Sequence, residues 1–374
     1  MKYYIIAGEA SGDMHAANLM REIALEDKDA AFRCHGGDKM QDAGGEIVRH
    51  YKDTAVMGFL TVLKNLGKIK RNLDFIKKDI KEWQPDVVIL VDFPGFNLKI
   101  AKYVKSIGIK TYYYISPKIW AWKKWRIKSI KKYIDKMLCI FPFEVDFYNQ
   151  YDYPVFYGGN PLVDAIENNL DRAETKDEFI SKNKLEQKPI IALLAGSRSQ
   201  ELKNILPEML NVISEYPDYQ FVIAGAPSMT NDDYREYIGD YKVEVVYDQT
   251  YQLVRHADAA LVASGTATLE TAIINTPEVV CYNAAGGKLL YNVLSSILKI
   301  KYVSLVNIIM GKETVKELLQ HNLNKELITK ELNAILYDDT YRNKMLSEFD
   351  ELREKLGSKG ASNRFAKEIV RSLS

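Results

Sequence analysis

The chain has 374 residues, of which 47% are hydrophobic, and a formal net charge of +1 at pH 7. This length allows two domains of ordinary size, and the near-neutral charge argues against a nucleic-acid partner. The three cysteines, Cys34, Cys139 and Cys281, form neither a metal-binding spacing nor a disulfide framework, so we expect a reducing cytoplasm. No apolar run approaches the roughly 20 residues that cross a bilayer, so any membrane contact is expected to be peripheral.

Short apolar runs alternate with amphipathic segments along the first half of the chain. The runs predict strands, and the segments with helical spacing of apolar residues predict helices. The predicted strands are 3–7, 31–34, 86–91, 110–114, 136–140 and 155–157, and the predicted helices are 14–25, 60–83, 98–106 and 125–133.

The pattern restarts near residue 188, after Asn160-Pro161 and the charged stretch 167–188. Here the predicted strands are 190–194, 220–224, 243–246, 259–262 and 278–282, and the predicted helices are 200–215, 251–256, 268–274 and several segments after Lys312. The alternation predicts an α/β fold of two doubly wound, Rossmann-like domains facing a cleft. We place the domains at 1–160 and 161–340, with C-terminal helices at 341–374 that pack across them.

Two motifs in the second half follow strands and open helices. Residues 196–201 (GSRSQE) follow one apolar run, and residues 264–270 (SGTATLE) follow another. Such a turn leaves unpaired N–H groups at the positive end of a helix dipole, which favours a bound anion. Ser and Thr also cap helices where nothing binds, but two such turns with Arg198 and Glu270 attached favour a nucleotide diphosphate.

Two loops of the first half stand at equivalent places, and a third segment is strongly basic. Residues 8–13 (GEASGD) and 92–97 (DFPGFN) follow strands, where doubly wound folds bind ligands.

Residues 111–132 hold three of the four tryptophans and seven basic residues without any acid. This composition is typical of a surface on anionic lipid, although a solvated basic helix with core tryptophans is the alternative.

Taken in order, these motifs make the chain similar to the lipid-A-disaccharide synthases, which are two-domain GT-B glycosyltransferases. The resemblance runs end to end and rests on residues 8–13, 57–58, 85–86, 92–97, 114–117, 120–122, 141–144, 196–201, 264–270 and 302–305 with Asn307. It implies that UDP-2,3-diacylglucosamine and 2,3-diacylglucosamine 1-phosphate give a β-1,6-linked disaccharide 1-phosphate and UDP, with inversion, on the cytoplasmic face of an inner membrane. Many members have His where this chain has Asn160, and some have Asp where it has Gly95, so neither role is transferred.

The second domain is then expected to bind the UDP-sugar, and the first to face the acceptor and the membrane. The expected UDP-sugar contacts are Gly196, Ser197, Arg198, Gln200, Glu201, Ser264, Gly265, Thr266, Ala267, Thr268, Glu270 and Asn307. We expect no cofactor and no metal, because the only Asp-x-Asp, at residues 27–29, lies at the polar end of the first predicted helix. Arg198 and the helix end would stabilise the leaving diphosphate instead. Asp92 is the preferred general base, with Asp13, Glu9 and His15 as competitors.

The remaining expectations concern the acceptor, the membrane and the partners. The expected acceptor contacts are Gly8, Glu9, Ala10, Ser11, Gly12, Met57, Asn97, Ser116 and Trp120, and the expected membrane contacts are Trp122, Lys123, Lys124, Trp125 and Lys128. The partners are the two lipid substrates and an anionic membrane surface, and an oligomer stays open. The alternatives are a muramyl-lipid N-acetylglucosaminyltransferase, a UDP-N-acetylglucosamine 2-epimerase, and a non-catalytic membrane-bound nucleotide-sugar sensor.

Overall fold

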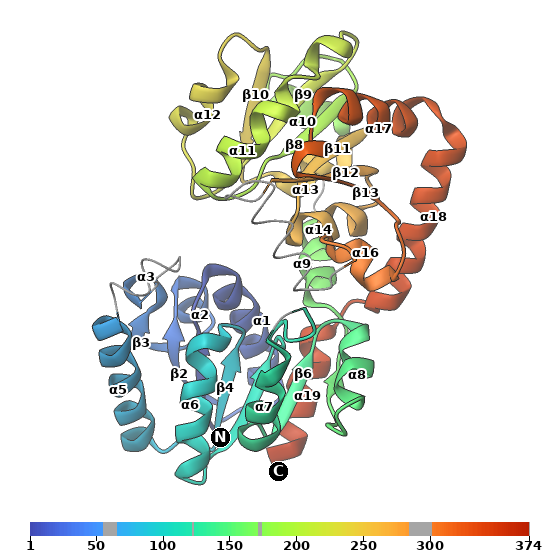
Figure 1. Cartoon of the computed structure of the whole chain (residues 1–374). Helices are drawn as coiled ribbons and strands as arrows, with labels where there is room; N and C mark the ends of the chain where they lie inside the picture. Colours follow the sequence, from blue (N-terminus) through green and yellow to red (C-terminus); the bar gives the residue numbers. More distant parts are fainter. Residues whose placement is uncertain (55–65, 122, 171–173, 284–300, 374) are drawn as a thin grey trace. The chain divides into compact units, whose positions relative to one another are not determined.

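The computed structural model describes residues 1–54, 66–121, 123–170, 174–283 and 301–373. The chain divides into two compact units (Figure 1). Unit 1 contains Met1–Asp164 and Ser358–Ser374, and unit 2 contains Ala165–Gly357. Each unit is built on its own parallel sheet, so the predicted α/β fold with two doubly wound sheets is confirmed.

Unit 1 has a seven-stranded parallel sheet in the order β3-β2-β1-β4-β5-β6-β7. Its strands are β1 (Lys2–Ala7), β2 (Ala31–Gly36), β3 (Glu46–His50), β4 (Val87–Val91), β5 (Lys110–Tyr114), β6 (Lys136–Cys139) and β7 (Phe156–Tyr157). The chain runs outward from β1 to β3 and then returns to the other side of β1 as β4. The strand order therefore reverses between β1 and β4, which is where doubly wound sheets open a crevice for ligands.

Helices cover both faces of this sheet. They are α1 (Ala10–Glu26), α2 (Asp38–Asp42), α3 (Tyr51–Thr54), α5 (Leu66–Trp83), α6 (Pro94–Ser106), α7 (Ile127–Tyr133), α8 (Pro142–Asn149) and α19 (Ala361–Leu373), with a short 3₁₀ turn η1 (Lys124–Arg126). A further helix, α9 (Pro161–Leu170), begins in unit 1 and continues into unit 2. Apolar residues of α5, α6 and α7 form one core with alternate residues of the strands. Figure 1 shows these three helices on one side of the sheet and α1 with α19 on the other.

The last helix, α19, belongs to unit 1 because the chain returns to it. The carboxylate of Asp164 accepts the N–H groups of Gly360 and Ser362 at 2.6 and 3.1 Å, which caps the helix. The ring of Phe365 packs edge-on against Tyr114 with 5.1 Å between centroids. The C-terminal helices are thus divided between the two units.

Unit 2 has a six-stranded parallel sheet in the order β10-β9-β8-β11-β12-β13, which reverses between β8 and β11. The strands are β8 (Ile190–Leu194), β9 (Gln220–Gly225), β10 (Val243–Tyr247), β11 (Ala259–Ala263), β12 (Glu278–Tyr282) and β13 (Lys316–Leu319). The helices are α10 (Lys176–Lys182), α11 (Ser199–Leu210), α12 (Asn231–Ile238), α13 (Thr250–His256), α14 (Thr266–Ile274), α16 (Leu305–Met310), α17 (Lys325–Tyr337) and α18 (Asp339–Leu356), with 3₁₀ turns η2 (Ile213–Glu215) and η3 (Gln320–Asn322).

The sequence analysis missed the two strands β3 and β13, and it was wrong to expect only helices after Lys312. Both strands lie at the edge of a sheet, and every residue of β3 keeps some solvent exposure. Edge strands carry charged residues and lack the continuous apolar run of central strands. The helices α2, α3, α8, α9, α10, α12 and α16 were also missed. Among the helices of the described ranges, none is long and apolar enough to span a bilayer.

Candidate functional site

The loop after β8 in unit 2 turns at Gly196. The φ of Gly196 is +105°, and a Cβ there would lie 2.4 Å from Glu201 Oε2, so the turn requires glycine. Glu201 Oε2 accepts the N–H of Ser197 at 2.9 Å, which closes the loop. The side chains of Ser197, Arg198 and Gln200 are exposed. Arg198 is 67% exposed, and its Nη1 lies 3.5 Å from Glu201 Oε1. Glu201 therefore shapes the loop, while Arg198 extends into solvent.

The loop after β11 leads directly into α14. Ser264 donates its N–H to the carbonyl of Cys281 and its Oγ to the carbonyl of Val303, at 3.0 and 3.2 Å. Thr268 is buried, and its Oγ1 donates to the carbonyl of Gly265. Gly265 and Thr266 are exposed, and the first-turn N–H groups of a helix have no intrahelical acceptor. The hydroxyls of Ser264 and Thr268 thus shape the turn, and the backbone N–H groups from Gly265 to Ala267 lie at the exposed start of α14.

Asn307 lies behind this turn with its side chain fully buried. Its Nδ2 donates to Val315 O and Glu317 Oε1, both at 2.9 Å, and its Oδ1 accepts the N–H groups of Thr314 and Val315. Glu317 also accepts the N–H groups of Val303 and Ser304, at 3.0 and 2.9 Å. The Asn307 side chain therefore fixes backbone near Ser264. Glu317 could not be identified from the sequence, because helices were predicted for the residues after Lys312 that include its strand.

Glu270 lies one turn into α14, where Tyr251 of α13 donates its hydroxyl to Oε1 at 2.9 Å. Burial raises the pKa of Glu270, and the hydrogen bond from Tyr251 opposes this rise. Tyr251 was not among the predicted site residues, because nothing in the spacing of the sequence pairs it with Glu270.

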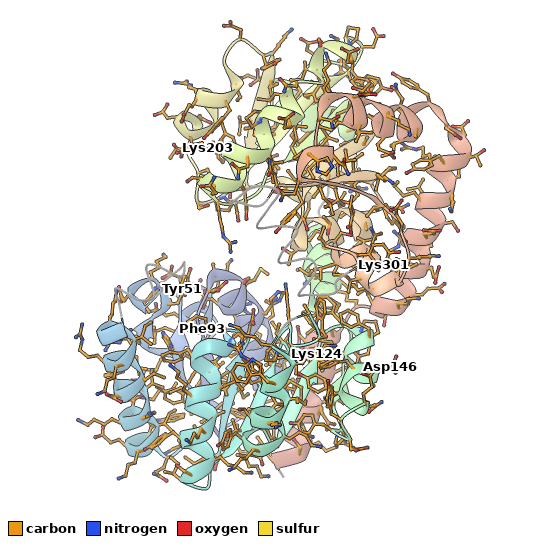
Figure 2. The ribbon with its side chains drawn as sticks, viewed as in Figure 1. Tyr51, Phe93, Lys124, Asp146, Lys203 and Lys301 are labelled. Carbon is orange, nitrogen blue, oxygen red and sulfur yellow. The ribbon has the colours of Figure 1, made fainter. Side chains whose placement is uncertain are left out.

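In unit 1, Asp92 ends β4 in a strained turn. The φ angles of Asp92 and Phe93 are +43° and +48°, a left-handed conformation that costs a non-glycine residue about 1–3 kcal/mol. Asn97 holds the turn through Nδ2, which donates to the carbonyls of Val91 and Asp92 at 3.1 and 2.7 Å. A Cβ on Gly8 would lie 2.5 Å from the Phe93 ring, so the loops after β1 and β4 touch. Figure 2 shows Phe93 where β4 passes into α6.

Four influences act on the carboxyl group of Asp92, and their sum raises its pKa. Burial is the largest and raises the pKa, the ammonium group of Lys118 lowers it, the carboxylate of Glu9 raises it again, and a hydrogen bond from the backbone of Phe93 lowers it. Lys118 follows β5 and is exposed, and Glu9 directly precedes α1. Residues from three adjacent strand ends therefore act on one carboxyl group, and a raised pKa suits a general base.

The competing residues of the first loop are held in other ways. The carboxylate of Asp13 is buried and accepts the N–H groups of Gly37, Lys39 and Met40 at 2.7, 3.1 and 3.2 Å. Burial lowers the pKa of His15 to about 4, so its imidazole stays neutral. Three N–H groups therefore already engage the lone pairs of the Asp13 carboxylate.

The other predicted acceptor residues differ in exposure. Ala10 and Ser11 are exposed at the start of α1, whereas Gly12 is buried. Ser116 is buried with its Oγ 2.8 Å from Tyr148 Oη, and the ring of Trp120 packs edge-on against Phe143. Met57 lies outside the described residues.

The predicted membrane residues gather after β5. Trp125 is 66% exposed. Lys123, Lys124 and Lys128 are exposed as well, and Figure 2 labels Lys124 on unit 1. Trp122 lies outside the described residues. Within the described ranges, no group of three or more His, Cys, Asp or Glu residues could hold a metal ion.

Comparison with known proteins gives matches over nearly the whole chain. The sequence model of a family described as Lipid-A-disaccharide synthetase matches residues 3–369. The chain is 36% identical to the lipid-A-disaccharide synthase of Trichlorobacter lovleyi over 368 residues, which cover 97% of this chain and 95% of that protein. It is 35% identical to the synthase of Geobacter metallireducens over 375 residues, covering 99% and 96%.

The solved structures show the same fold at low sequence identity. A putative UDP-N-acetylglucosamine 2-epimerase from Listeria monocytogenes superposes with a TM-score of 0.71 at 13% identity, covering 100% of this chain and 96% of that one.

Proposed function

The chain belongs to the lipid-A-disaccharide synthase family and is a hexosyltransferase, and we propose how its two sites divide the reaction. The reaction joins UDP-2,3-diacylglucosamine to 2,3-diacylglucosamine 1-phosphate, forms a β-1,6 linkage and releases UDP. One observation carries the proposal: in each unit, the two motif loops follow the two neighbouring strands between which the strand order reverses.

Unit 2 is proposed to bind the UDP-sugar and to stabilise the departing diphosphate. The exposed start of α14 offers N–H groups from Gly265 to Ala267, and the exposed guanidinium of Arg198 offers a charge. Fixed donors of this kind stabilise charge as it develops and need not reorganise during the reaction. Glu270 is proposed to accept hydrogen bonds from the ribose. Leaving-group stabilisation without a metal ion belongs to this proposal.

Unit 1 is proposed to bind the acceptor and to remove the proton from its 6-hydroxyl. Asp92 is the base in this proposal, because its raised pKa and its position at the carboxyl end of strand β4 both suit proton transfer. Lys118 and Glu9 would tune that base, and the exposed start of α1 at Ala10 and Ser11 would contact the acceptor.

We also propose that unit 1 meets an anionic membrane surface through the segment that follows β5. The exposed Trp125 and the exposed Lys123, Lys124 and Lys128 combine an aromatic anchor with positive charge, as interfacial segments do. A peripheral position on the cytoplasmic face would bring the enzyme to both acylated substrates. An oligomeric state is not part of the proposal.

The test of the proposed function measures UDP release from UDP-2,3-diacylglucosamine with and without 2,3-diacylglucosamine 1-phosphate in mixed micelles. Release that requires both substrates, with an acylated disaccharide as product, is the expected result. Turnover of UDP-N-acetylglucosamine in its place would favour one of the alternative enzymes. Binding of UDP without release from any donor and acceptor pair would identify a sensor.

A further inference from the structure

Tyr251 and Glu270 form a side-chain pair between α13 and α14, the helices that follow β10 and β11. The Tyr251 hydroxyl donates to Glu270 Oε1 at 2.9 Å, across 19 residues of sequence. The two residues stand on α13 and α14, which pack against each other. The bond therefore fixes the orientation of a carboxylate that would otherwise sample several rotamers.

The pair lines a hollow of about 280 Å³. Its other lining residues are Asp248, Thr250 and Gln252, so every lining side chain carries a polar group. Small-ligand pockets span about 300–1,000 Å³, so this hollow suits one sugar ring rather than a whole nucleotide sugar. A ring that carries neighbouring hydroxyl groups would find acceptors there.

The carboxylate of Glu270 has acceptor sites left for hydrogen bonds from such hydroxyl groups. An ionised carboxylate offers about four lone-pair sites, and Tyr251 occupies one of them on Oε1. Partial burial of Glu270 strengthens any hydrogen bond that its other oxygen accepts. The bond from Tyr251 also favours the ionised form over the protonated one.

We propose that Tyr251 is a positioning residue that holds Glu270 to receive the ribose hydroxyls of a nucleoside diphosphate, so that the pair selects ribonucleotides over deoxyribonucleotides. The proposal rests on the proposed function of unit 2 and adds to it a residue and a selectivity. A ligand without these hydroxyls leaves the carboxylate without a donor. Loss of a hydrogen bond to a charged group weakens binding by about 10–150-fold.

The experiment measures binding of UDP and of 2′,3′-dideoxy-UDP by calorimetry to the whole chain. The wild type should prefer UDP by about 10-fold or more. Tyr251→Phe should reduce that preference by about 2–10-fold, by weakening UDP while leaving dideoxy-UDP unchanged. Glu270→Gln should reduce the preference further.

Tyr216→Phe is the matched control in the same unit. It also removes a bonded tyrosine hydroxyl, which donates to the carbonyl of Thr329 at 3.0 Å, and it should leave the preference unchanged. If Tyr251→Phe does not fold, Tyr251→Leu serves in its place, because it also removes the hydroxyl that donates to Glu270, so the preference must again fall. Glu270→Asp tests the carboxylate separately, since its shorter side chain withdraws the acceptor.

Each contrary outcome has a distinct meaning. A Tyr251→Phe variant that keeps the full preference, or that weakens both nucleotides equally, would overturn the positioning role of Tyr251. A wild type that binds both nucleotides equally would overturn the selectivity of the pair. A wild type that binds neither nucleotide would instead refute the proposed function of unit 2.

Discussion

The charge environment of Asp92 gives a prediction about the pH dependence of catalysis. If Asp92 is the base, only its ionised form accepts the proton, so kcat/KM falls as the pH drops through its pKa. Asp92→Asn keeps the shape of the side chain, and Asn tolerates the left-handed φ of +43° at this position. The variant should fold normally and lose about 10²–10⁴-fold in turnover, with UDP binding retained.

Two further variants should shift the pH at which kcat/KM falls on the acid side, and they should shift it in opposite directions. This falling part of the pH profile is its acid limb. Lys118 lowers the pKa of Asp92, so Lys118→Met should raise that pKa and move the limb to higher pH. Glu9 raises the pKa of Asp92, so Glu9→Gln should lower it and move the limb to lower pH. Lys118 is exposed and Glu9 partly so, and solvent screens both charges, so each shift should be smaller at high salt than at low salt.

The assay is UDP release at low substrate concentration across the pH range in which the enzyme stays folded, each profile normalised to its own plateau. Normalisation separates the position of the limb from any loss of acceptor binding. Asp146→Asn is the control, since Asp146 is an exposed acid on α8 of the same unit (Figure 2). Shifts of the same sign in Lys118→Met and Glu9→Gln, or full activity of Asp92→Asn, would refute the assignment of Asp92 as the base.

Three further predictions concern the leaving group, the membrane and stability. Arg198→Ala should slow UDP release by at least about 10-fold without unfolding, because it removes one fixed donor; Arg235→Ala on α12 is the control, and equal rates in both would remove Arg198 from the site. Neutralising three lysines after β5 should weaken binding to anionic vesicles about 100-fold at low salt, and neutralising three exposed lysines of α5 and α6 should not. The first set is Lys123, Lys124 and Lys128, and the control set is Lys78, Lys81 and Lys102; equal vesicle binding by both variants would contradict the proposed membrane surface. Burial raises the pKa of Glu278 well above its ordinary value of 4.5. Above pH 4.5 the folded state therefore keeps a proton that the unfolded chain releases, so the free energy of unfolding falls as the pH rises above 4.5. Glu278→Gln should therefore stabilise the protein by about 1.4 kcal/mol for each pH unit above that value until the folded carboxyl ionises, as measured by urea unfolding; a gain that does not vary with pH would contradict this.

The central strands and the loops that follow them could be predicted from the sequence, because buried parallel strands are continuous apolar runs. β4, β8 and β11 are buried at every position, and each is followed by a motif of small or polar residues. β3 and β13 could not be predicted in this way, because their sequences, EIVRH and KELL, contain charged residues and are not continuous apolar runs.

The roles of individual motif residues were harder to predict than the location of the motifs. Asp13 and Asn307 belong to the expected site, yet their side chains are engaged with backbone groups far from them in sequence. Tyr251 and Glu317 were missed for the corresponding reason. Each acts on a partner that only the tertiary fold brings near, Glu270 for one and Ser304 for the other.

This distribution of roles has a consequence for how the site of unit 2 responds to mutation. Several motif side chains, including Ser264, Thr268 and Glu201, bond to backbone groups of their own unit, so at the start of α14 the backbone N–H groups are left as donors. A side-chain deletion cannot remove an N–H group and acts only by moving it. Loss of a support such as Glu317 should then change diphosphate binding and stability together, because the same bonds hold both. Loss of Arg198, which is 67% exposed, should change binding alone. The ratio of the loss in diphosphate binding to the loss in stability therefore separates the groups that contact the ligand from those that hold the backbone in place.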